Sequence, residues 1–373
     1  MSDAATSDTL DIHRLLEIMV KQKASDLHLT VLAPPAFRIN GEVHTLRRAE
    51  PLKADDIQRL AYSVMTEKQK RTFEEQSEID LSFEWKGAAR FRANFFRQQG
   101  AVAAALRQIP QDVHTMEQLG LPRSVRAMVD RVRGLILVTG PTGSGKSTTL
   151  SSMIDAINAN ARGHIITIED PIEFVHQHKR CIVNQREVGS DTRSFRDALR
   201  YVLRQDPDVV LIGEIRDLET MEAALRISET GHLVLATLHT NNTIQTIHRV
   251  LDFYPARQQD MVRTQLSFVL EGVLSQQLIP RADGAGRVMA IEVMVPNPAI
   301  RNLIREDKTH QIYSQMQIGK AHHGMQTLNE SLTQLVTSRA ITVEQALNHS
   351  YDPEELEAML RGDGRPGQPV TRR

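Results

Sequence analysis

Cysteine is almost absent from this chain, since Cys181 is the single one among 373 residues. A lone cysteine cannot form an internal disulfide, and it cannot build a zinc site that needs several cysteines. These two ways of holding a fold together are therefore excluded. We expect Cys181 to be an inert strand residue rather than a catalytic thiol.

Long hydrophobic runs and a surplus of charge are also lacking. No apolar stretch approaches the ~20 residues that a helix needs to cross a bilayer. Residues 1–5 lack the basic region and apolar block of a secretory signal, so we expect a cytoplasmic protein. The formal net charge is −1, which gives the chain as a whole no electrostatic attraction to nucleic acid or anionic lipid.

Length and composition predict a globular protein with two compact domains. The 373 residues exceed what one hydrophobic core usually accommodates, and 40% hydrophobic residues are enough for two cores. Residues 1–110 read as a small α+β domain that contains the Asn40-Gly41 signal of a tight hairpin. We expect a polar linker at 111–132 and a disordered tail at 362–373. The elements expected in the first domain are a helix at 10–20, strands at 27–29, 79–85, 88–96 and 101–109, and a hairpin at 37–43.

Residues 133–361 alternate strand and helix patterns, as a parallel sheet covered by helices requires. This pattern predicts an α/β, RecA-like nucleotide-binding core, followed by a helical part after residue 298. The strands that we expect are 135–139, 165–169, 209–213, 233–238 and 288–295. The helices that we expect, besides one after the loop at 140–145, are 194–204, 218–228, 243–251, 299–305, 312–318, 328–336 and 343–347.

A phosphate-binding loop follows the apolar run at 135–138. Residues 140–147 match the pattern Gly-x-x-x-x-Gly-Lys-[Ser/Thr] between a strand and a helix, a match too complete for an ordinary Gly/Ser turn. In such a loop, backbone N–H groups and the positive end of the helix face the anion. Lys146 would reach the β- and γ-phosphates of a nucleoside triphosphate, and the Ser147 hydroxyl would bind Mg²⁺. The residues expected to contact the nucleotide are Gly140, Pro141, Thr142, Gly143, Ser144, Gly145, Lys146, Ser147 and Thr148.

Two acidic motifs follow other strands of this core. The apolar strand 209–212 leads to Gly213 and Glu214, and the strand 165–168 leads to the acidic segment 169–173. Phosphoryl transfer to water needs a residue that orients the water, and we assign this role to Glu214. Gly213 stands where a metal-binding Asp is common, so the metal must depend on other carboxylates, and the acidic segment is the candidate. The alternative for that segment is a solvated loop.

These motifs resemble those of the secretion ATPases, the superfamily that drives type II secretion and type IV pili. Segments 168–173 and 213–217 are similar to its Asp box and Walker B motif, and 230–232 with 237–240 are similar to its His box. The resemblance extends from about residue 24 to about residue 335. It implies an ATP-hydrolysing homohexamer, in which each nucleotide lies between the core of one subunit and the smaller, PAS-like N-terminal domain of a neighbour.

The resemblance also implies roles for individual residues. Glu173 and Glu214 match the acids of the Asp box and Walker B motif, while His232 and His239 match the His box and would sense the γ-phosphate. Three arginines of the N-terminal domain match positions that supply positive charge to the γ-phosphate: Arg90, Arg92 and Arg107. Plainer interpretations are an exposed salt bridge for each arginine and a structural hydrogen bond for each histidine.

Segment 299–306 is similar to a signature of the retraction ATPases of type IV pili. The absence of a long N-terminal extension and of a four-cysteine zinc site also separates the chain from extension ATPases. The resemblance thus implies a twitching-motility motor at the cytoplasmic face of the inner membrane, with a pilus platform protein and a paralogous retraction ATPase as candidate partners. A pilus extension or type II secretion ATPase, and a nucleotide-gated regulatory subunit of another pilus ATPase, stay open as alternatives. Near-neutral charge and the lack of a nucleic-acid-binding module argue against a nucleic-acid motor.

Overall fold

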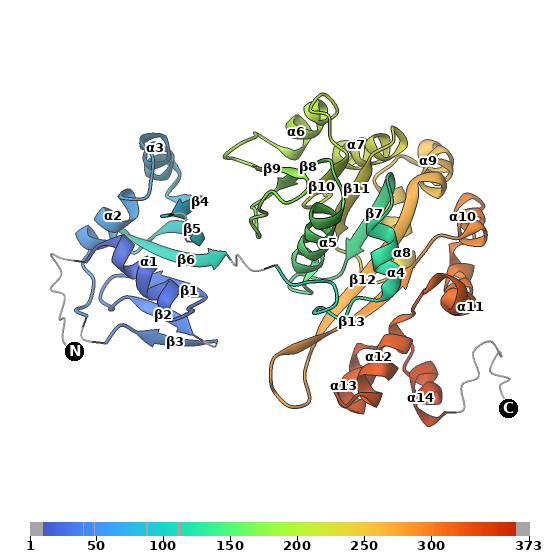
Figure 1. Ribbon diagram of the computed structural model, residues 1–373. Helices are drawn as coiled ribbons and strands as arrows, with labels where there is room; N and C mark the ends of the chain where they lie inside the picture. Colours follow the sequence, from blue (N-terminus) through green and yellow to red (C-terminus); the bar gives the residue numbers. More distant parts are fainter. Residues whose placement is uncertain (1–9, 40, 48, 87–88, 110–112, 363–373) are drawn as a thin grey trace. The chain divides into compact units, whose positions relative to one another are not determined.

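The computed structural model describes residues 10–39, 41–47, 49–86, 89–109 and 113–362, and Figure 1 shows it in colours that follow the sequence. The chain divides into two compact units, residues 1–112 and 113–373. Each unit has its own sheet and its own hydrophobic packing. Within the described ranges, the helices are too short or too polar to cross a membrane.

The first unit is a six-stranded sheet with helices, coloured blue to cyan in Figure 1. Its elements are α1 (Ile12–Lys21), β1 (Asp26–Leu29), β2 (Ala36–Ile39), β3 (Glu42–Thr45), α2 (Ala54–Tyr62), α3 (Glu67–Gln76), β4 (Glu78–Trp85), β5 (Ala89–Gln98) and β6 (Ala101–Ile109). The strand order is β3-β2-β1-β6-β5-β4, and neighbouring strands pair antiparallel. Alternate residues of β5, such as Phe91 and Phe95, are buried with apolar residues of α1, α2 and α3. This is the α+β architecture that the sequence predicts.

The local predictions for this unit differ in their outcome. The predicted hairpin forms, because Ile39 pairs with Glu42 across a two-residue turn in which Gly41 has a φ of +89°. Asn40, the other half of that signal, lies outside the described residues, as do positions 87–88. The helices α2 and α3 were not predicted. Of the ten residues of α3, all of them described, Phe73 alone is buried, so the helix has almost no apolar periodicity to detect.

The second unit is built on a seven-stranded sheet. Its elements are α4 (Arg123–Val129), β7 (Gly134–Thr139), α5 (Lys146–Asn160), β8 (His164–Glu169), β9 (Ile182–Glu187), α6 (Phe195–Val202), β10 (Val209–Ile212), α7 (Leu218–Glu229), β11 (Leu233–Leu238), α8 (Thr243–Asp252), α9 (Ala256–Val269), β12 (Leu270–Pro280), β13 (Arg287–Met294), α10 (Pro298–Arg305), the 3-10 helix η2 (Thr309–Gln311), α11 (Ile312–His323), α12 (Leu328–Thr337), α13 (Val343–His349) and α14 (Pro353–Arg361). The strand order is β13-β12-β7-β11-β10-β8-β9. Six strands run parallel, and β13 pairs antiparallel with β12 at one edge.

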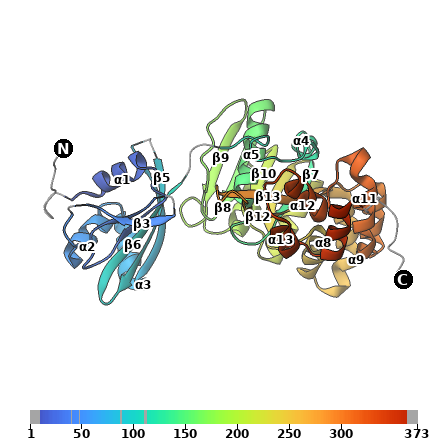
Figure 2. The same cartoon turned by 90° about the horizontal axis from the view of Figure 1, so that it is seen from below.

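Helices cover both faces of this sheet, so its central strands are buried on both sides and consist of apolar residues. Successive residues of β7 enter different cores: Leu135 and Leu137 pack with α7, α8 and α9, whereas Ile136 and Val138 pack with α4 and α5. Figure 2 shows α5 on one side of the strands, and α8 and α9 on the other. The unit is thus the three-layer, RecA-like fold that the sequence predicts.

The C-terminal helices form a small cluster of their own against β12 and β13. Ile279 and Ala290 of these two strands are buried together with Leu328, Leu332 and Leu356 of α12 and α14. The predicted helices after residue 298 are present as α10, α11, α12 and α13, whereas α14 was not predicted. The tail predicted to be disordered, 362–373, lies outside the described residues except for its first residue.

Candidate active site

The predicted phosphate loop connects β7 to α5. Gly140, Gly143 and Gly145 have φ values of +142°, +79° and +88°, in the left-handed region that favours glycine. A Cβ atom on Gly140 would lie 2.3 Å from the backbone oxygen of Gln276, which belongs to β12. The loop therefore requires glycine at position 140, and β12 forms the surface on which the loop rests.

Lys146 begins α5 and turns back over this loop. Its Nζ atom donates hydrogen bonds to the carbonyl oxygens of Gly140 (2.9 Å) and Pro141 (3.1 Å). Burial lowers the pKa of Lys146, and the negative charges of Glu214 and Glu173 act in the opposite direction. Because charge–charge interactions weaken with distance, both predicted catalytic carboxylates lie near the Lys146 ammonium group.

Glu214 follows β10, and each oxygen of its carboxylate contacts one side chain. Its Oε2 accepts a hydrogen bond of 2.7 Å from Arg216, and its Oε1 lies 3.1 Å from His239 Nε2. Partial burial acts to raise the pKa of Glu214, but the hydrogen bond and charge of Arg216, with the charges of His239 and Lys146, hold this pKa below its ordinary value. Glu214 is therefore ionised at neutral pH, as an acceptor for a proton from water must be.

The acidic segment after β8 is fixed by β9, a strand that the sequence did not predict. The backbone N–H of Ile172 donates to Glu187 (3.1 Å), and that of His176 donates to Gln185 (2.7 Å). Glu173 lies between these two anchored positions, and its side chain is exposed. The segment is thus a positioned loop rather than a freely solvated one, with one carboxylate free to face a ligand.

Glu169, the last residue of β8, is partly buried and differs from the other acids of the site in the pKa of its carboxyl group. Its Oε1 accepts hydrogen bonds from Thr167 (2.6 Å) and Gln185 (3.3 Å). Burial raises the pKa of Glu169 to about 7, and although hydrogen bonds oppose the rise, the charge of Glu173 adds to it. A carboxyl group with this pKa is protonated in the folded protein at mildly acidic pH.

We therefore expect the stability of the nucleotide-free protein to fall as Glu169 ionises. The pKa is higher in the folded than in the unfolded state, so the free energy of unfolding decreases as the pH rises from the unfolded value of 4.5 through about 7. Between about pH 5.5 and pH 8, wild type should lose about 1 to 2 kcal/mol relative to Glu169→Gln, which has no proton to release. Urea unfolding of both proteins at both pH values measures this difference. Parallel pH profiles would mean that Glu169 titrates normally.

Three buried polar atoms at the phosphate loop lack a hydrogen-bond partner within the described part of the chain: Thr139 Oγ1, Ser144 Oγ and Gln276 Oε1. Gln276 also donates a hydrogen bond of 2.7 Å from Nε2 to the carbonyl oxygen of Ser144. Unsatisfied polar atoms are costly inside a protein unless a ligand or water completes them. The loop therefore fits a polar ligand such as a phosphate chain with its metal ion. Gln276 was not predicted as a site residue.

The structure separates the two predicted histidines. His239 follows β11 and meets Glu214, whereas His232 precedes β11, where its Nδ1 lies 3.2 Å from the backbone oxygen of Ile227. A strand rises about 3.3 Å per residue, so seven residues place the two histidines about 20 Å apart. Within this subunit only His239 of the two contacts a predicted catalytic carboxylate, and His232 makes the structural hydrogen bond that was its alternative. The action of both histidines on a nucleotide stays a prediction.

The three predicted arginines belong to the first unit. Arg90 and Arg92 lie on β5 and Arg107 lies on β6, with Arg92 directly opposite Arg107 in the sheet. The Nε atom of Arg107 donates a hydrogen bond of 2.8 Å to the carboxylate of Asp26. Like charges on facing positions repel each other, and the Asp26 carboxylate balances the charge of Arg107. The action of these arginines on a nucleotide stays a prediction.

Segment 299–306 forms most of α10, and both of its arginines make hydrogen bonds to neighbouring elements. Arg301 donates hydrogen bonds to the carbonyl oxygen of Ser267 (2.7 Å) and to the carboxylate of Glu271 (2.9 Å). Arg305 donates to the Ser267 hydroxyl (3.3 Å). These bonds fasten α10 to the junction of α9 and β12.

Comparison with known proteins adds independent information. The family model for type II/IV secretion system proteins matches residues 3–348. The type IV pilus retraction ATPase PilT of Pseudomonas aeruginosa is 51% identical over 347 residues, which cover 93% of this chain and 100% of that protein. The type IV pilus ATPase PilU of the same organism is 42% identical, over 94% of this chain and 92% of PilU. A crystal structure of the pilus retraction motor PilT with bound ADP has a TM-score of 0.89 and 54% identity, over 94% of this chain and 100% of that one.

Proposed function

The chain belongs to the family of type II/IV secretion system proteins, and we propose that it is an ATP-hydrolysing hexameric motor that powers retraction of type IV pili. Retraction is favoured over extension or secretion by the 51% identity to PilT over the full length of that protein. A purely regulatory role is disfavoured because a regulator has little need for a complete set of hydrolytic residues.

One observation carries the ATPase proposal. The phosphate loop follows β7, Glu214 follows β10, and Glu173 lies in the segment after β8, and these strands run parallel in one sheet. Parallel strands end at the same edge of a sheet, where ligands bind in folds of this class. A triphosphate in the loop would therefore have the two carboxylates beside its terminal phosphate.

In the proposed reaction, Lys146 and the backbone of the phosphate loop bind the β- and γ-phosphates. Glu214 orients a water molecule and accepts its proton while the new oxygen–phosphorus bond forms and the bond to ADP breaks. Glu173 would assist at the metal and at the water, and His239 would respond to the γ-phosphate through its contact with Glu214. Ser147 would bind Mg²⁺, which neutralises charge on the phosphates. Positive charge would also come from a neighbouring subunit, through Arg90, Arg92 and Arg107.

The proposal extends to the assembly and its location. Each nucleotide would lie at the border of two subunits, and domain rotations linked to nucleotide occupancy would produce movement. We place the hexamer in the cytoplasm, at the inner membrane, with the pilus platform protein as its partner. A paralogous retraction ATPase is a second candidate partner, because the chain is also 42% identical to PilU.

Two measurements test this function. The purified hexamer should release phosphate from Mg²⁺·ATP, and deletion of the gene should leave cells with many pili and no twitching motility. Phosphate release is measured in solution, and pili are counted by electron microscopy beside a motility assay. Cells without pili would instead favour an extension ATPase. A clean lack of turnover by the assembled ring would favour the regulatory subunit.

A further inference from the structure

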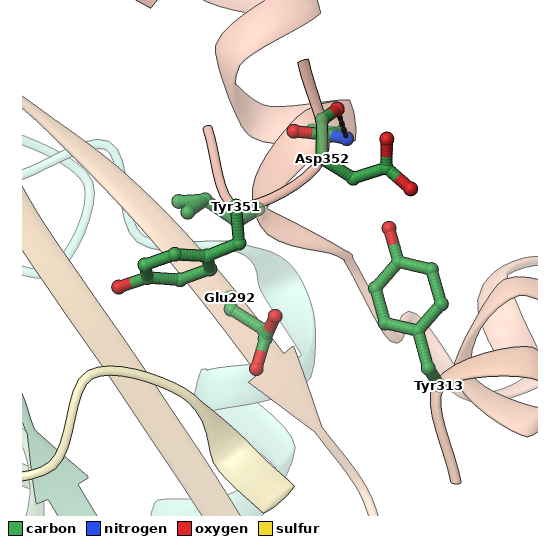
Figure 3. Close-up of a pocket in the computed structure, with 6 residues that line it drawn as sticks. Glu292, Tyr313, Tyr351 and Asp352 are labelled. Carbon is green, nitrogen blue, oxygen red and sulfur yellow. Dashed lines mark hydrogen bonds between the residues drawn. The ribbon is translucent and has the colours of Figure 1, made fainter. Parts of the chain in front are cut away.

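A small pocket lies where the C-terminal helices meet the core sheet (Figure 3). It has a volume of about 200 Å³. Its lining combines β13, α11, α12 and the connection between α13 and α14: Glu292, Tyr313, Leu328, Asn329, Tyr351 and Asp352. The two tyrosines lie on different sides of the pocket, and their hydroxyl groups point in different directions (Figure 3). The pocket is therefore lined both by the core sheet and by the C-terminal helical part of the second unit.

The hydroxyl of Tyr351 contacts the loop that follows β11. It donates a hydrogen bond of 2.8 Å to the carbonyl oxygen of Asn241 and accepts one of 2.8 Å from Gln277. The hydroxyl of Ser275 donates to the same carbonyl oxygen at 2.7 Å. Asn241 comes two residues after His239, which lies 3.1 Å from Glu214. A residue of the C-terminal helical part thus reaches the loop that carries the histidine of the site.

A second group from the same pocket fixes the far end of this loop. The backbone N–H of Thr243, the first residue of α8, donates a hydrogen bond of 2.7 Å to Glu292. The side chain of Asn242 caps α8 by accepting from the N–H of Gln245 at 2.8 Å. The loop between His239 and α8 is therefore held by Tyr351 and Ser275 at its middle and by Glu292 at its end.

We propose that Tyr351 is a positioning residue for the active site: it holds the loop at 239–242 so that His239 faces Glu214, and it couples this loop to α12, α13 and α14. The proposal rests on the ATPase function proposed above. Tyr351 is 50% exposed and Asn241 is exposed. The hydrogen bond between them therefore lies outside the buried core and contributes little to the stability of the fold. Its consequence is the geometry of the loop rather than the stability of the fold.

The test compares Tyr351→Phe with Tyr313→Phe in the full-length protein. Both changes remove one hydroxyl at the same pocket, but the Tyr313 hydroxyl donates to Glu355 on α14 and not to the loop. We expect Tyr351→Phe to lower the kcat of ATP hydrolysis about three- to tenfold, the effect of one lost neutral hydrogen bond, with KM and Tm unchanged. Tyr313→Phe should keep the kcat of wild type. Amide hydrogen exchange of residues 239–245 should be faster in Tyr351→Phe alone.

Each outcome decides the proposal. A lower kcat together with faster exchange, in Tyr351→Phe but not in Tyr313→Phe, supports positioning by the Tyr351 hydroxyl. Unchanged exchange in the loop, or equal effects of both variants, overturns it. Should wild type not hydrolyse ATP at all, the proposed function fails, and the exchange measurement alone then decides whether Tyr351 positions the loop.

Discussion

Replacing Lys146 with alanine is expected to abolish nucleotide binding at working concentrations. The ammonium group is the one cation that the phosphate loop itself supplies, and it is already directed over the loop by bonds to Gly140 and Pro141. Charge-assisted hydrogen bonds to phosphate contribute about 1.5 to 3 kcal/mol each, so losing contacts to two phosphates should weaken binding about 100-fold or more. Calorimetry with Mg²⁺·ATP measures the affinity, and phosphate release measures turnover.

The matched control for this change is Lys179→Ala. Lys179 also contacts α5, through an ion pair of 2.7 Å with Asp155, but it lies on the segment between β8 and β9 and not on the phosphate loop. Its loss removes the same charge from the neighbourhood of the same helix, at a partly exposed site where an ion pair contributes little to stability. We expect wild-type affinity and turnover. Equal losses in both variants would point to general damage to α5, and full binding by Lys146→Ala would remove the loop from the mechanism.

The sequence predicts the strands that are buried on both faces, because such strands are continuous apolar runs. Four strands at the centre of the sheet, β7, β8, β10 and β11, are apolar runs because helices cover both of their faces. The phosphate loop is also predictable, because the anion requires glycine and lysine at fixed spacing. The sequence therefore predicts the features that depend on burial or ligand chemistry of residues close together in the chain.

The strands that escaped prediction, β9 and β12, carry polar side chains that serve the site. Gln185 of β9 fixes the acidic segment, and Gln276 of β12 supports the phosphate loop. A polar residue that is buried to hold a loop interrupts the hydrophobic periodicity on which strand prediction depends. Its partner is also remote in the chain, since Gln276 is 132 positions from Ser144. No local pattern reveals such a contact.

The two histidines of the predicted His box lie at opposite ends of one strand. His232 and His239 are seven positions apart, and the six residues between them form one extended strand, β11. Because a strand is extended, its two ends lie far apart, one at the amino ends and the other at the carboxyl ends of the parallel strands. The spacing therefore places the two histidines at different ends of β11, whereas the resemblance to one motif implies that both act on a nucleotide. Only His239 lies with the carboxylates in this subunit.

Replacing Glu214 with glutamine is expected to separate binding from hydrolysis. Glutamine keeps the size of the side chain and leaves the phosphate loop intact, so Mg²⁺·ATP should bind with nearly wild-type affinity. It cannot accept a proton, and the loss of a general base lowers kcat by about 10²- to 10⁴-fold. The released partners, Arg216 and His239, are 63% and 43% exposed, so water can solvate them and the fold should remain stable. Single-turnover phosphate release, beside calorimetric binding, measures the two effects.

Glu219→Gln is the matched control for the Glu214 variant. Glu219 lies five positions further along, on α7, and it is exposed in an ion pair of 3.4 Å with Arg196. Glu219→Gln removes the same charge, but at a side chain that does not contact Lys146, His239 or the phosphate loop. The kcat of this variant should therefore stay at the wild-type value. A Glu214→Gln enzyme that still turns over at full rate would shift the task of water activation to Glu173, the other carboxylate that acts on Lys146. Loss of activity in both variants would instead indicate that net charge at this edge of the sheet, and not proton acceptance by one residue, limits hydrolysis.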